Sequence, residues 1–157
     1  MTAAATPPAS SERATSTEKA DADSISATLG VIGDRWSFLV LRGVFRGLAR
    51  FSDLRDDLGI ASNLLTSRLK ALVDNGVLEK VEYCERPKRY EYVLTPAGRD
   101  LSGVLVSLMQ WGDQHLNESR PVVLVHSECN HPIENVTICS HCNMEVPATA
   151  IRRMDEG

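Results

Sequence analysis

The sequence has little of what marks membrane-spanning, secreted or catalytic proteins. No apolar run in its 157 residues approaches the roughly 20 residues that cross a bilayer. The N-terminus lacks a positively charged start followed by an apolar segment, so we expect no signal peptide and a cytoplasmic protein. No Ser/His/Asp arrangement, phosphate-binding loop or pair of carboxylates in a cleft is recognisable, and we therefore expect no enzyme.

An excess of positive charge is also missing, since the formal net charge is -4. This value argues against a broadly cationic coat for nucleic acid. A local basic face is still compatible with it, because many acidic residues lie in the tails and before position 60, whereas residues 86–89 are basic. Charge alone therefore does not exclude DNA binding.

Cysteine is scarce, and three of the four cysteines lie near the C-terminus. In a cytoplasmic protein we expect reduced thiols or metal ligands rather than structural disulfides. A His-x2-Cys pair and a Cys-x2-Cys pair, joined by residues 133–138, offer four ligands suited to tetrahedral zinc. We expect one structural Zn²⁺ ion per chain, held by His126, Cys129, Cys139 and Cys142.

Alternatives exist for this tail. His131 and His141 are alternate ligands, and His131 can replace His126. The competing interpretation is a loop with reduced cysteines, or with a Cys139–Cys142 disulfide after oxidation. A segment this small lacks apolar mass, which favours a metal ion as its core.

Composition divides the chain into four parts. Residues 1–22 are rich in Ala, Ser, Thr and Pro without apolar periodicity, which predicts a disordered N-terminal arm. Residues 23–118 show the apolar periodicity of a folded domain, and the motifs described below predict that it binds DNA and dimerises. Residues 119–150 form the Cys/His tail, which is similar to a zinc ribbon, and residues 151–157 are expected as a disordered end.

Three short helices are expected at the start of the folded domain, over residues 24–33, 36–46 and 53–58. The second is apolar on most sides and should be a central buried helix, with Trp36 packed in the core. Ser52 is expected to cap the third helix, because its side chain can accept the free N–H groups of a first turn.

A fourth helix, within residues 60–77, is the most informative stretch of the chain. It is predicted to begin at Ser62 as its cap and to end at Asn75-Gly76. One face carries apolar residues at helical spacing that would be buried, namely Leu65, Leu69, Leu72 and Val73. The opposite face is polar and has no acidic residue, which suits base edges in a major groove; it consists of Asn63, Thr66, Ser67 and Lys70. An ordinary solvated helix face is the alternative.

After Gly76 the apolar period changes from 3.6 to 2, which predicts strands over residues 77–84 and 90–94. Two helices joined by a tight turn and followed by such a hairpin form a winged helix-turn-helix. The loop of residues 85–89 is basic, and we expect it to contact phosphates or enter a minor groove rather than serve only as a solvated loop. The predicted contacts to the DNA backbone are Ser52, Ser62, Arg68, Arg86, Lys88 and Arg89.

A last helix is expected over residues 97–116, with Thr95 as its cap and Pro96 at its first position. Its apolar stripe is longer than one small domain needs, so part of it should pack against a second copy of the chain. Packing on its own domain alone is the alternative. The stripe consists of Leu101, Val104, Leu105, Leu108 and Trp111.

Six motifs within residues 24–116 point together to one family. They are Gly33-Asp-Arg-Trp36, Arg50-Phe-Ser-Asp-Leu54, Leu65-Thr-Ser-Arg-Leu-Lys-Ala-Leu72, Gly76-Val-Leu-Glu79, Tyr90-Glu-Tyr-Val-Leu-Thr-Pro-Ala-Gly98 and Gln110-Trp-Gly112. In combination they resemble the HxlR-type winged helix-turn-helix regulators of the MarR-like superfamily. The resemblance implies a mainly α fold with a small β-hairpin (α+β). It also implies a DNA-binding homodimer, joined through terminal helices, that reads a roughly palindromic operator.

The chain departs from this family just before the first helix. Family members often carry a cysteine there, in some a redox sensor, whereas Asp23 and Ser24 stand here. Neither side chain can form a sulfenic acid or a disulfide, so oxidant sensing through this position is excluded. Cys84, in the strand entering the wing, is either a thiol sensor or an inert packed residue.

These features predict a sequence-specific transcription regulator, acting as a repressor on a palindromic operator. The recognition helix of residues 62–75 would lie in the major groove, and the wing of residues 85–89 on phosphates or in the minor groove. The alternative is a winged-helix module that contacts proteins without specific DNA binding. The expected partners are double-stranded DNA, a second copy of the chain and an unidentified small-molecule effector. No membrane is involved, and the expected location is cytoplasmic and nucleoid-associated.

Overall fold

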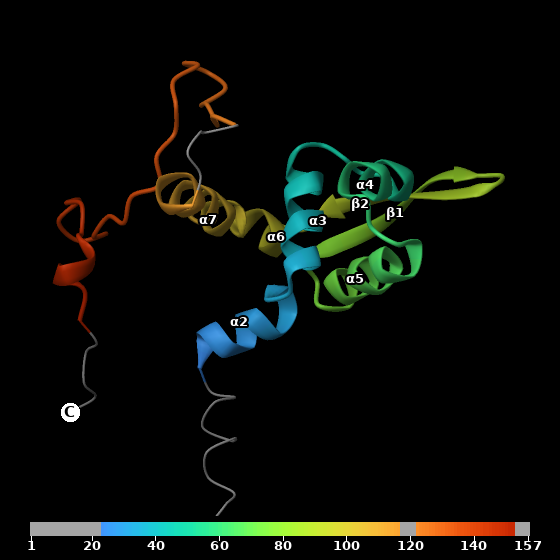
Figure 1. Cartoon of the computed structure of the whole chain (residues 1–157), viewed down its shortest axis with the longest axis horizontal. Coiled ribbons are helices and arrows are strands. Elements are labelled where there is room, and N and C mark those ends of the chain that lie inside the picture. The colour runs from blue at the N-terminus through green and yellow to red at the C-terminus, as the bar shows by residue number, and fades with distance from the viewer. Residues whose placement is uncertain (1–22, 117–121, 153–157) are drawn as a thin grey trace, which may run out of the picture. The chain divides into compact units, whose positions relative to one another are not determined.

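The computed structural model describes residues 23–116 and 122–152 (Figure 1). The chain forms two compact units, one up to Gly98 and one from Arg99 onward. The predicted disordered arm and most of the predicted disordered end lie outside the described residues. Among the helices of the described ranges, none is long and apolar enough to cross a membrane.

The first unit is a helical body with one antiparallel hairpin, which confirms the predicted α+β class (Figure 1). The hairpin aligns Leu78 with Leu94 and projects beyond the helices. In chain order the elements are α2 (Ser24–Ile32), α3 (Arg35–Phe45), α4 (Phe51–Leu58), α5 (Ser62–Asp74), β1 (Leu78–Glu85) and β2 (Lys88–Leu94).

Helix α3 lies at the centre of this unit and contacts α4, α5 and β2. Val40 and Leu41 on this helix are fully buried. Burial of each such side chain stabilises the fold by roughly 1.5–3 kcal/mol. Trp36 departs from the expectation of core packing, because it is only half-buried and lies beneath the Arg35 guanidinium at 5.4 Å. The apolar core consists of Ile32, Val40, Leu41, Val44, Leu54, Ile60, Leu65, Leu69, Leu72, Val77 and Leu78.

Two predicted helix caps are wrong. Arg50 and Ala61 occupy the cap positions of α4 and α5, and neither makes a side-chain cap hydrogen bond. Ser52 and Ser62 already lie inside the helices, because the last extended backbone conformations belong to Arg50 and Ala61. A hydroxyl inside the first turn no longer faces the free N–H groups that a cap residue serves.

The ends of these helices agree with the sequence. Gly59 and Gly76 take left-handed conformations, with φ of 60° and 70°. Glycine adopts this conformation without the steric cost that a Cβ atom would bring. The two glycines therefore end α4 and the recognition helix where the pattern predicted.

The helix predicted over residues 97–116 is interrupted at Leu101, which corrects that prediction. The chain instead forms α6 (Pro96–Asp100) and α7 (Ser102–His115). Its predicted start is confirmed, since the Gly98 N–H donates to Thr95 Oγ1 at 3.0 Å. Ser102 and Gly103 follow the break directly, and their low helix propensity accounts for it.

The second unit contains α7 and the tail. Of the residues described after position 121, only Ala148–Ala150 form a helix, a short 3-10 turn (η1). The predicted hairpin-like link of residues 133–138 has no internal strand pairing and is instead bound to α7. Asn135 donates from its backbone N–H to Gln110 Oε1 at 3.0 Å and from Nδ2 to the Gly103 carbonyl at 2.8 Å.

Candidate nucleic-acid interface

Helix α5 exposes a polar face, as its sequence predicts. Leu65, Leu69 and Leu72 are buried on the inner side and fix the rotation of the helix. That rotation leaves four polar side chains exposed on the outer side, namely Asn63, Thr66, Ser67 and Lys70. Side chains of this kind can donate to and accept from base edges, and their contacts with bases stay predictions.

Some of these polar groups already have partners on the helix. Thr66 Oγ1 donates to the Ser62 carbonyl at 2.8 Å. The ammonium of Lys70 is paired with Asp74, one turn further along. The face is therefore not free of acidic groups, because Asp74 brings a carboxylate to its C-terminal end. Lys70 would exchange this exposed ion pair, worth little in water, for a base contact.

Arg68 has a different environment from the rest of the predicted DNA-contacting residues. Its Nε lies 3.2 Å from Asp34 Oδ1 and is buried, with no hydrogen-bond partner among the described residues. Oδ1 already accepts the N–H groups of Trp36 and Ser37, at 3.0 and 3.2 Å. Arg68 thus links α5 to the start of α3 and is positioned by Asp34 rather than directed freely toward solvent.

Asp34 anchors the recognition helix through this contact. It is the cap of α3 and also accepts a short hydrogen bond from the Ser37 hydroxyl. Burial raises the pKa of Asp34, but hydrogen bonds from Ser37 and Trp36 and the charge of Arg68 outweigh it and lower the pKa below the ordinary value. The carboxylate therefore stays ionised and holds α3 and α5 together.

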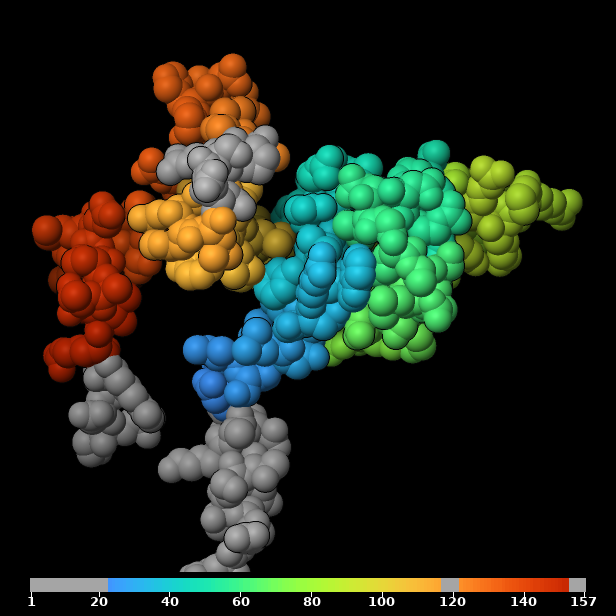
Figure 2. Space-filling view, viewed as in Figure 1, coloured from blue at the N-terminus to red at the C-terminus, as the bar shows by residue number. Residues whose placement is uncertain are grey.

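The wing differs from its prediction in length. Both strands extend further, so the predicted loop of residues 85–89 shrinks to a turn at Arg86 and Pro87. Lys88 and Arg89 therefore belong to β2, near its start. Figure 2 shows the hairpin tip reaching beyond the helical body. Arg86, Lys88 and Arg89, at or near this tip, are exposed. The strands continue because Glu85 and Lys88 still pair across the hairpin.

The wing cations differ in how firmly they are engaged. Lys88 Nζ lies 3.5 Å from Glu82 Oε2, and Lys80 Nζ lies 4.0 Å from the centre of the Tyr90 ring. Arg86 and Arg89 form no ion pair within the described ranges, and both are exposed. These two guanidinium groups are the ones most available to phosphate.

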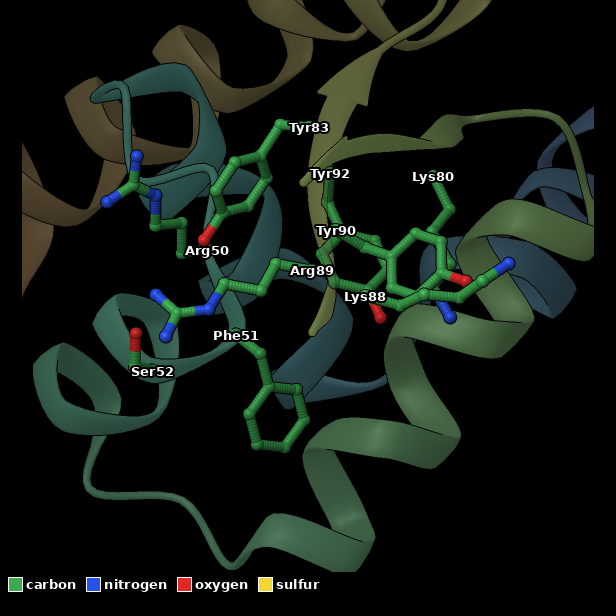
Figure 3. Close-up of a pocket in the computed structure, with 9 residues that line it drawn as sticks. All are labelled: Arg50, Phe51, Ser52, Lys80, Tyr83, Lys88, Arg89, Tyr90 and Tyr92. Carbon is green, nitrogen blue, oxygen red and sulfur yellow. The ribbon is translucent and has the colours of Figure 1, made fainter. Parts of the chain in front are cut away.

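A basic hollow of about 370 Å³ lies between the wing and the start of α4 (Figure 3). Arg89 extends toward Ser52, and Lys88 points to the opposite side. The sequence analysis assigned Ser52, Lys88 and Arg89 to this interface. It missed the strand residue Lys80 and the aromatic rings, although their alternating positions along the strands were a signal that could have identified them. The hollow is lined by Arg50, Phe51, Ser52, Lys80, Tyr83, Lys88, Arg89, Tyr90 and Tyr92.

Arg50 fixes one wall of this hollow. Its Nε donates to Glu91 Oε1 at 3.0 Å, and its guanidinium lies 4.8 Å from the centre of the Tyr83 ring. The Glu91 hydrogen bond raises the pKa of Arg50 further. The Tyr92 N–H also donates to the Ala49 carbonyl at 2.7 Å, so the link before α4 is attached to β2.

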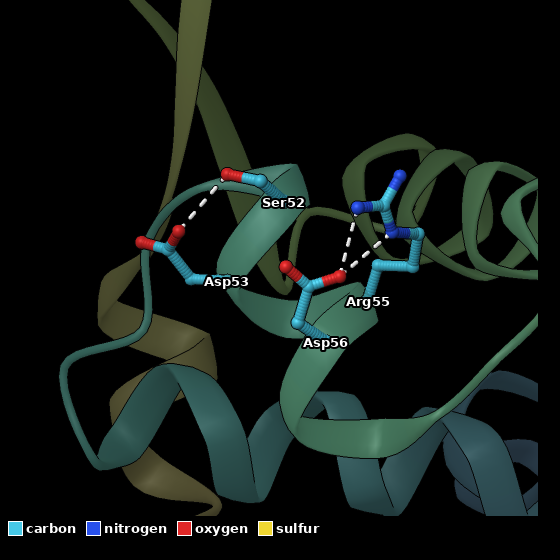
Figure 4. A network of polar contacts seen from close by, with 4 residues as sticks. All are labelled: Ser52, Asp53, Arg55 and Asp56. Carbon is cyan, nitrogen blue, oxygen red and sulfur yellow. Dashed lines mark hydrogen bonds and ion pairs between the residues drawn. The ribbon is translucent and has the colours of Figure 1, made fainter.

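Acidic residues of α4 are mostly engaged by neighbours (Figure 4). The Ser52 hydroxyl donates to Asp53 at 2.9 Å, and Arg55 contacts Asp56 at 2.8 Å. The positive charge of Arg55 offsets that of the Asp56 carboxylate and so reduces its repulsion of DNA phosphates. Ser52 can still offer its hydroxyl to a phosphate oxygen, since exchanging its Asp53 contact costs little at an exposed position.

The predicted metal ligands form two separate pairs. Nδ1 of His126 lies 3.2 Å from Cys129 Sγ, whereas Cys139 interacts with Cys142. Within the described residues, no three His, Cys, Asp or Glu side chains come together as a metal cluster. The half-buried Cys84 donates to the Arg86 carbonyl at 3.7 Å, at the base of the wing turn.

The arrangement can bind a polyanion. A polar helix face and a cationic hairpin, both parts of the first unit, offer contacts of different kinds to bases and phosphates. Ser, His and acidic side chains of the described ranges do not converge on a nucleophile and base in the hollow. The geometry thus favours recognition of nucleic acid.

Sequence comparison gives the same result. Residues 31–120 match the family model described as HxlR-like helix-turn-helix. A protein of Mycobacterium tuberculosis, named as an uncharacterised HTH-type transcriptional regulator, is 42% identical over 130 residues, which is 82% of each chain. YtcD of Bacillus subtilis, with a name of the same kind, is 37% identical over 95 residues, or 60% of this chain and 75% of that protein.

Solved structures share the fold. The crystal structure of PA1607, a proposed transcription factor, matches with a TM-score of 0.79 at 32% identity, covering 90% of this chain and 100% of that one. The redox regulator HypR in its reduced form matches with a TM-score of 0.55 at 29% identity, covering 59% of this chain and 92% of that one. The sequence resemblance and the winged-helix fold are therefore confirmed.

Proposed function

Because the chain belongs to the HxlR-like helix-turn-helix family, we propose that it is a sequence-specific transcription regulator that represses by occupying its operator. The observation that carries this proposal is the combination of an exposed polar face on α5 with two exposed guanidinium groups on the wing, those of Arg86 and Arg89, which form no ion pair with any residue that the structure describes. A repressor needs only to bind tightly where polymerase would bind, and these surfaces supply contacts for that binding.

The polar face of α5 and the wing would make different kinds of contact with DNA. Asn63, Thr66, Ser67 and Lys70 on α5 would read bases in the major groove. Arg86 and Arg89, with Lys88 after release from Glu82, would contact phosphates or enter the minor groove. Ser52 and Ser62 would add hydroxyl contacts to the DNA backbone, whereas Arg68 would act mainly by holding α5.

A homodimer on a palindromic operator completes the proposal. Helix α7 exposes Val104, Leu108 and Trp111 to 44%, 50% and 56% in the single chain. Ile25 and Leu29 of α2 are exposed to 68% and 54%. Apolar helix surfaces of this kind are usually covered in assemblies, and a two-fold axis would give two recognition helices matched to an inverted repeat.

This function has consequences for location and chemistry. A protein that occupies chromosomal operators acts where the chromosome is, so the proposal places it in the cytoplasm, associated with the nucleoid. It is proposed to be a regulator rather than an enzyme. An unidentified small-molecule effector that shifts DNA affinity is part of the proposal.

The salt dependence of DNA binding tests this function directly. Arg86→Ala and Arg89→Ala should weaken binding to all DNA sequences and each reduce the salt slope by about one released counterion. Arg46→Ala is the matched control, because that exposed arginine is paired with Asp57 at 3.2 Å. Fluorescence anisotropy over a salt series measures both quantities.

The alternative function, a winged helix that contacts only proteins, predicts a different outcome. Wild-type protein would then fail to bind promoter fragments even at low salt, and the wing variants would match the Arg46→Ala control. Equal slopes for the wild type, the two wing variants and the control would contradict the assignment of the wing to phosphates.

A further inference from the structure

Two turns in the tail share one backbone design. In the first, the Asn130 N–H donates to the His126 carbonyl at 2.7 Å, and the His126 N–H donates to the His131 carbonyl at 2.9 Å. In the second, the Asn143 N–H donates to the Cys139 carbonyl at 2.8 Å, and the Cys139 N–H donates to the Met144 carbonyl at 2.9 Å. The spacing between donor and acceptor is identical in the two turns.

The match extends beyond these hydrogen bonds. Asn130 and Asn143, at the same place in each turn, have φ of 58° and 55°. Asparagine tolerates this left-handed conformation better than most residues. An isolated bridge closes each turn, and the two bridges join Val125 to Pro132 and Ile138 to Glu145. We call these two turns the first and second knuckle, residues 125–132 and 138–145.

Each knuckle brings two potential ligands together at equivalent positions. In the first, His126 Nδ1 lies 3.2 Å from Cys129 Sγ. In a tetrahedral zinc site of ordinary bond lengths, a nitrogen and a sulfur ligand lie about 3.5 Å apart. In the second, Cys139 and Cys142 take the places of His126 and Cys129 and interact through their side chains.

The second knuckle also directs hydrogen bonds at a potential ligand sulfur. The backbone N–H groups of Cys142 and His141 donate to the Cys139 sulfur. Thiolate is the form that binds metal, and hydrogen bonds of this kind stabilise a ligand sulfur. The knuckle is exposed and has no apolar core among the described residues that would explain its shape otherwise.

The structure also distinguishes His126, the expected ligand, from His131, the alternate ligand. Nδ1 of His131 lies 2.8 Å from the Cys129 carbonyl, where it is placed to donate. His126 instead directs Nδ1 at the Cys129 sulfur. His126 therefore shares the ligand position with Cys139, and His131 supports the turn through the backbone.

We propose that the two knuckles are the two halves of one tetrahedral Zn²⁺ site, with His126, Cys129, Cys139 and Cys142 as ligands and one ion per chain. Three thiolates and one imidazole form a donor set typical of structural zinc. All four positions are filled by protein, so the ion stabilises the tail rather than catalysing a reaction.

The ion must join halves that lie apart, since no three ligand-type side chains cluster within the described residues. The segment between the knuckles is tied to α7 by Asn135, and Gln110 Nε2 donates to the Ile133 carbonyl at 3.1 Å. The second knuckle thus comes either from the same chain after a rearrangement of this segment or from a second copy. The ligand chemistry is the same for both sources.

Cobalt substitution tests the site on the full-length chain. Purified protein loaded with Co²⁺ should show visible bands of tetrahedral cobalt and thiolate-to-metal charge transfer. Cys139→Ser/Cys142→Ser and His126→Ala/Cys129→Ser should each reduce bound metal from about one ion to less than about 0.2 per chain. Cys84→Ser is the control and should bind as the wild type does.

Several outcomes would overturn the proposal. Wild-type protein that binds no Co²⁺ or Zn²⁺ would do so, as would a spectrum that survives loss of either knuckle or disappears with Cys84→Ser. Among single variants, His126→Ala should weaken binding more than His131→Ala, and the reverse order would remove His126 from the ligand set. Circular dichroism of each variant shows whether the helices remain folded.

Mixing the two knuckle variants identifies the source of the second half. Each double variant lacks one half and retains the other. After joint refolding, a cobalt spectrum that returns assigns the two halves to different chains, whereas continued absence assigns them to one chain. Light scattering on the same mixture confirms that the chains associate, so a missing dimer is not mistaken for an intrachain site.

Discussion

At the scale of one residue, Asp34 shows how the fold positions the polar face of α5. This carboxylate caps α3, accepts the Ser37 hydroxyl and faces Arg68 on α5. The Gly33-Asp-Arg-Trp36 motif thus has a physical role that does not involve DNA contact. It sets the recognition helix against the central helix before any ligand is present.

Removal of this carboxylate should destabilise the protein. Asp34→Ala removes a helix cap and leaves Arg68 without its partner, which should lower the free energy of unfolding by about 1–2 kcal/mol at neutral pH. Because the folded-state pKa of Asp34 is below its ordinary value of 3.8, this contribution is present above that value and is lost as pH falls through the folded pKa. Urea denaturation at pH 7 and pH 3 should therefore show a smaller difference between variant and wild type at the lower pH.

Asp23→Ala provides the matched control for this prediction. Asp23 caps α2 through longer hydrogen bonds, 3.3 and 3.4 Å, and it is exposed. Its removal should cost less than that of Asp34. Equal costs for the two variants, or a difference that does not change with pH, would contradict the role given to Asp34.

Sequence periodicity predicted the exposed positions of α5 but not their partners. Leucine spacing fixed which face of the helix turns outward, so Asn63, Thr66 and Ser67 were assignable as exposed. The pairing of Arg68 with Asp34 brings together two residues that lie 34 positions apart in the sequence, which local pattern does not encode.

At the scale of elements, a group of hydrogen bonds around Thr95, which we call the seam, fixes the base of the wing. Thr95 Oγ1 donates to the Gly76 carbonyl at 2.6 Å and accepts the Gly98 N–H at 3.0 Å. The Thr95 N–H also donates to the Val77 carbonyl at 3.2 Å. These bonds connect the end of α5, the start of β1 and the start of α6.

Gly98 is required at this seam because the backbones approach closely. A Cβ atom at Gly98 would lie 2.1 Å from the Val77 carbonyl oxygen. Gly98→Ala should therefore destabilise the protein by about 1–3 kcal/mol, since backbone rather than a flexible side chain must move. Thermal unfolding followed by circular dichroism measures this effect.

Gly30→Ala is the control for that substitution. Gly30 lies within α2, and a Cβ atom there would meet nothing within 4 Å. Alanine should be neutral or stabilise by up to about 1 kcal/mol at this helical position. If Gly98→Ala were as mild as Gly30→Ala, the close approach at the seam would be wrong.

The order and kind of the elements were predictable, but some of their boundaries were not. Apolar periodicity identified the hairpin and the four helices before it, α2 to α5, because buried faces repeat at fixed spacing. Ser52 and Ser62 resembled caps by residue type, yet the backbone became helical before them. The short wing turn depends on strand pairing, which outweighs local preference. The break at Leu101 instead coincides with Ser102 and Gly103, two residues of low helix propensity.

At the scale of the whole molecule, the exposed apolar side chains of α7 require a partner in the proposed function. Leu108 and Trp111 are each about half exposed, at 50% and 56%. Burial of this surface would contribute about 25 cal/mol per Å² of apolar area. The polar side of the same helix is already covered by the tail, through Gln110 and Asn135.

Leu108→Asp should therefore weaken self-association. A buried, unpaired carboxylate is costly at an apolar interface, so the dimer should dissociate at least about tenfold more readily. Gln114→Asp adds the same charge at an exposed polar position of α7 and should leave association unchanged. Light scattering across a concentration series measures both, and dimers of equal strength for the two variants would contradict the assigned surface.

The central claim is that α5 reads DNA sequence while the wing holds the backbone. Selection of bound fragments from genomic DNA, carried out with the wild type and with Asn63→Ala, tests it most directly. The account predicts an inverted repeat with half-site centres about 10 base pairs apart, or a multiple of that spacing. Asn63→Ala should relax one symmetric pair of positions by about 1–3 kcal/mol. Bound fragments without a shared repeat, or an unchanged preference at every position for Asn63→Ala, would contradict it.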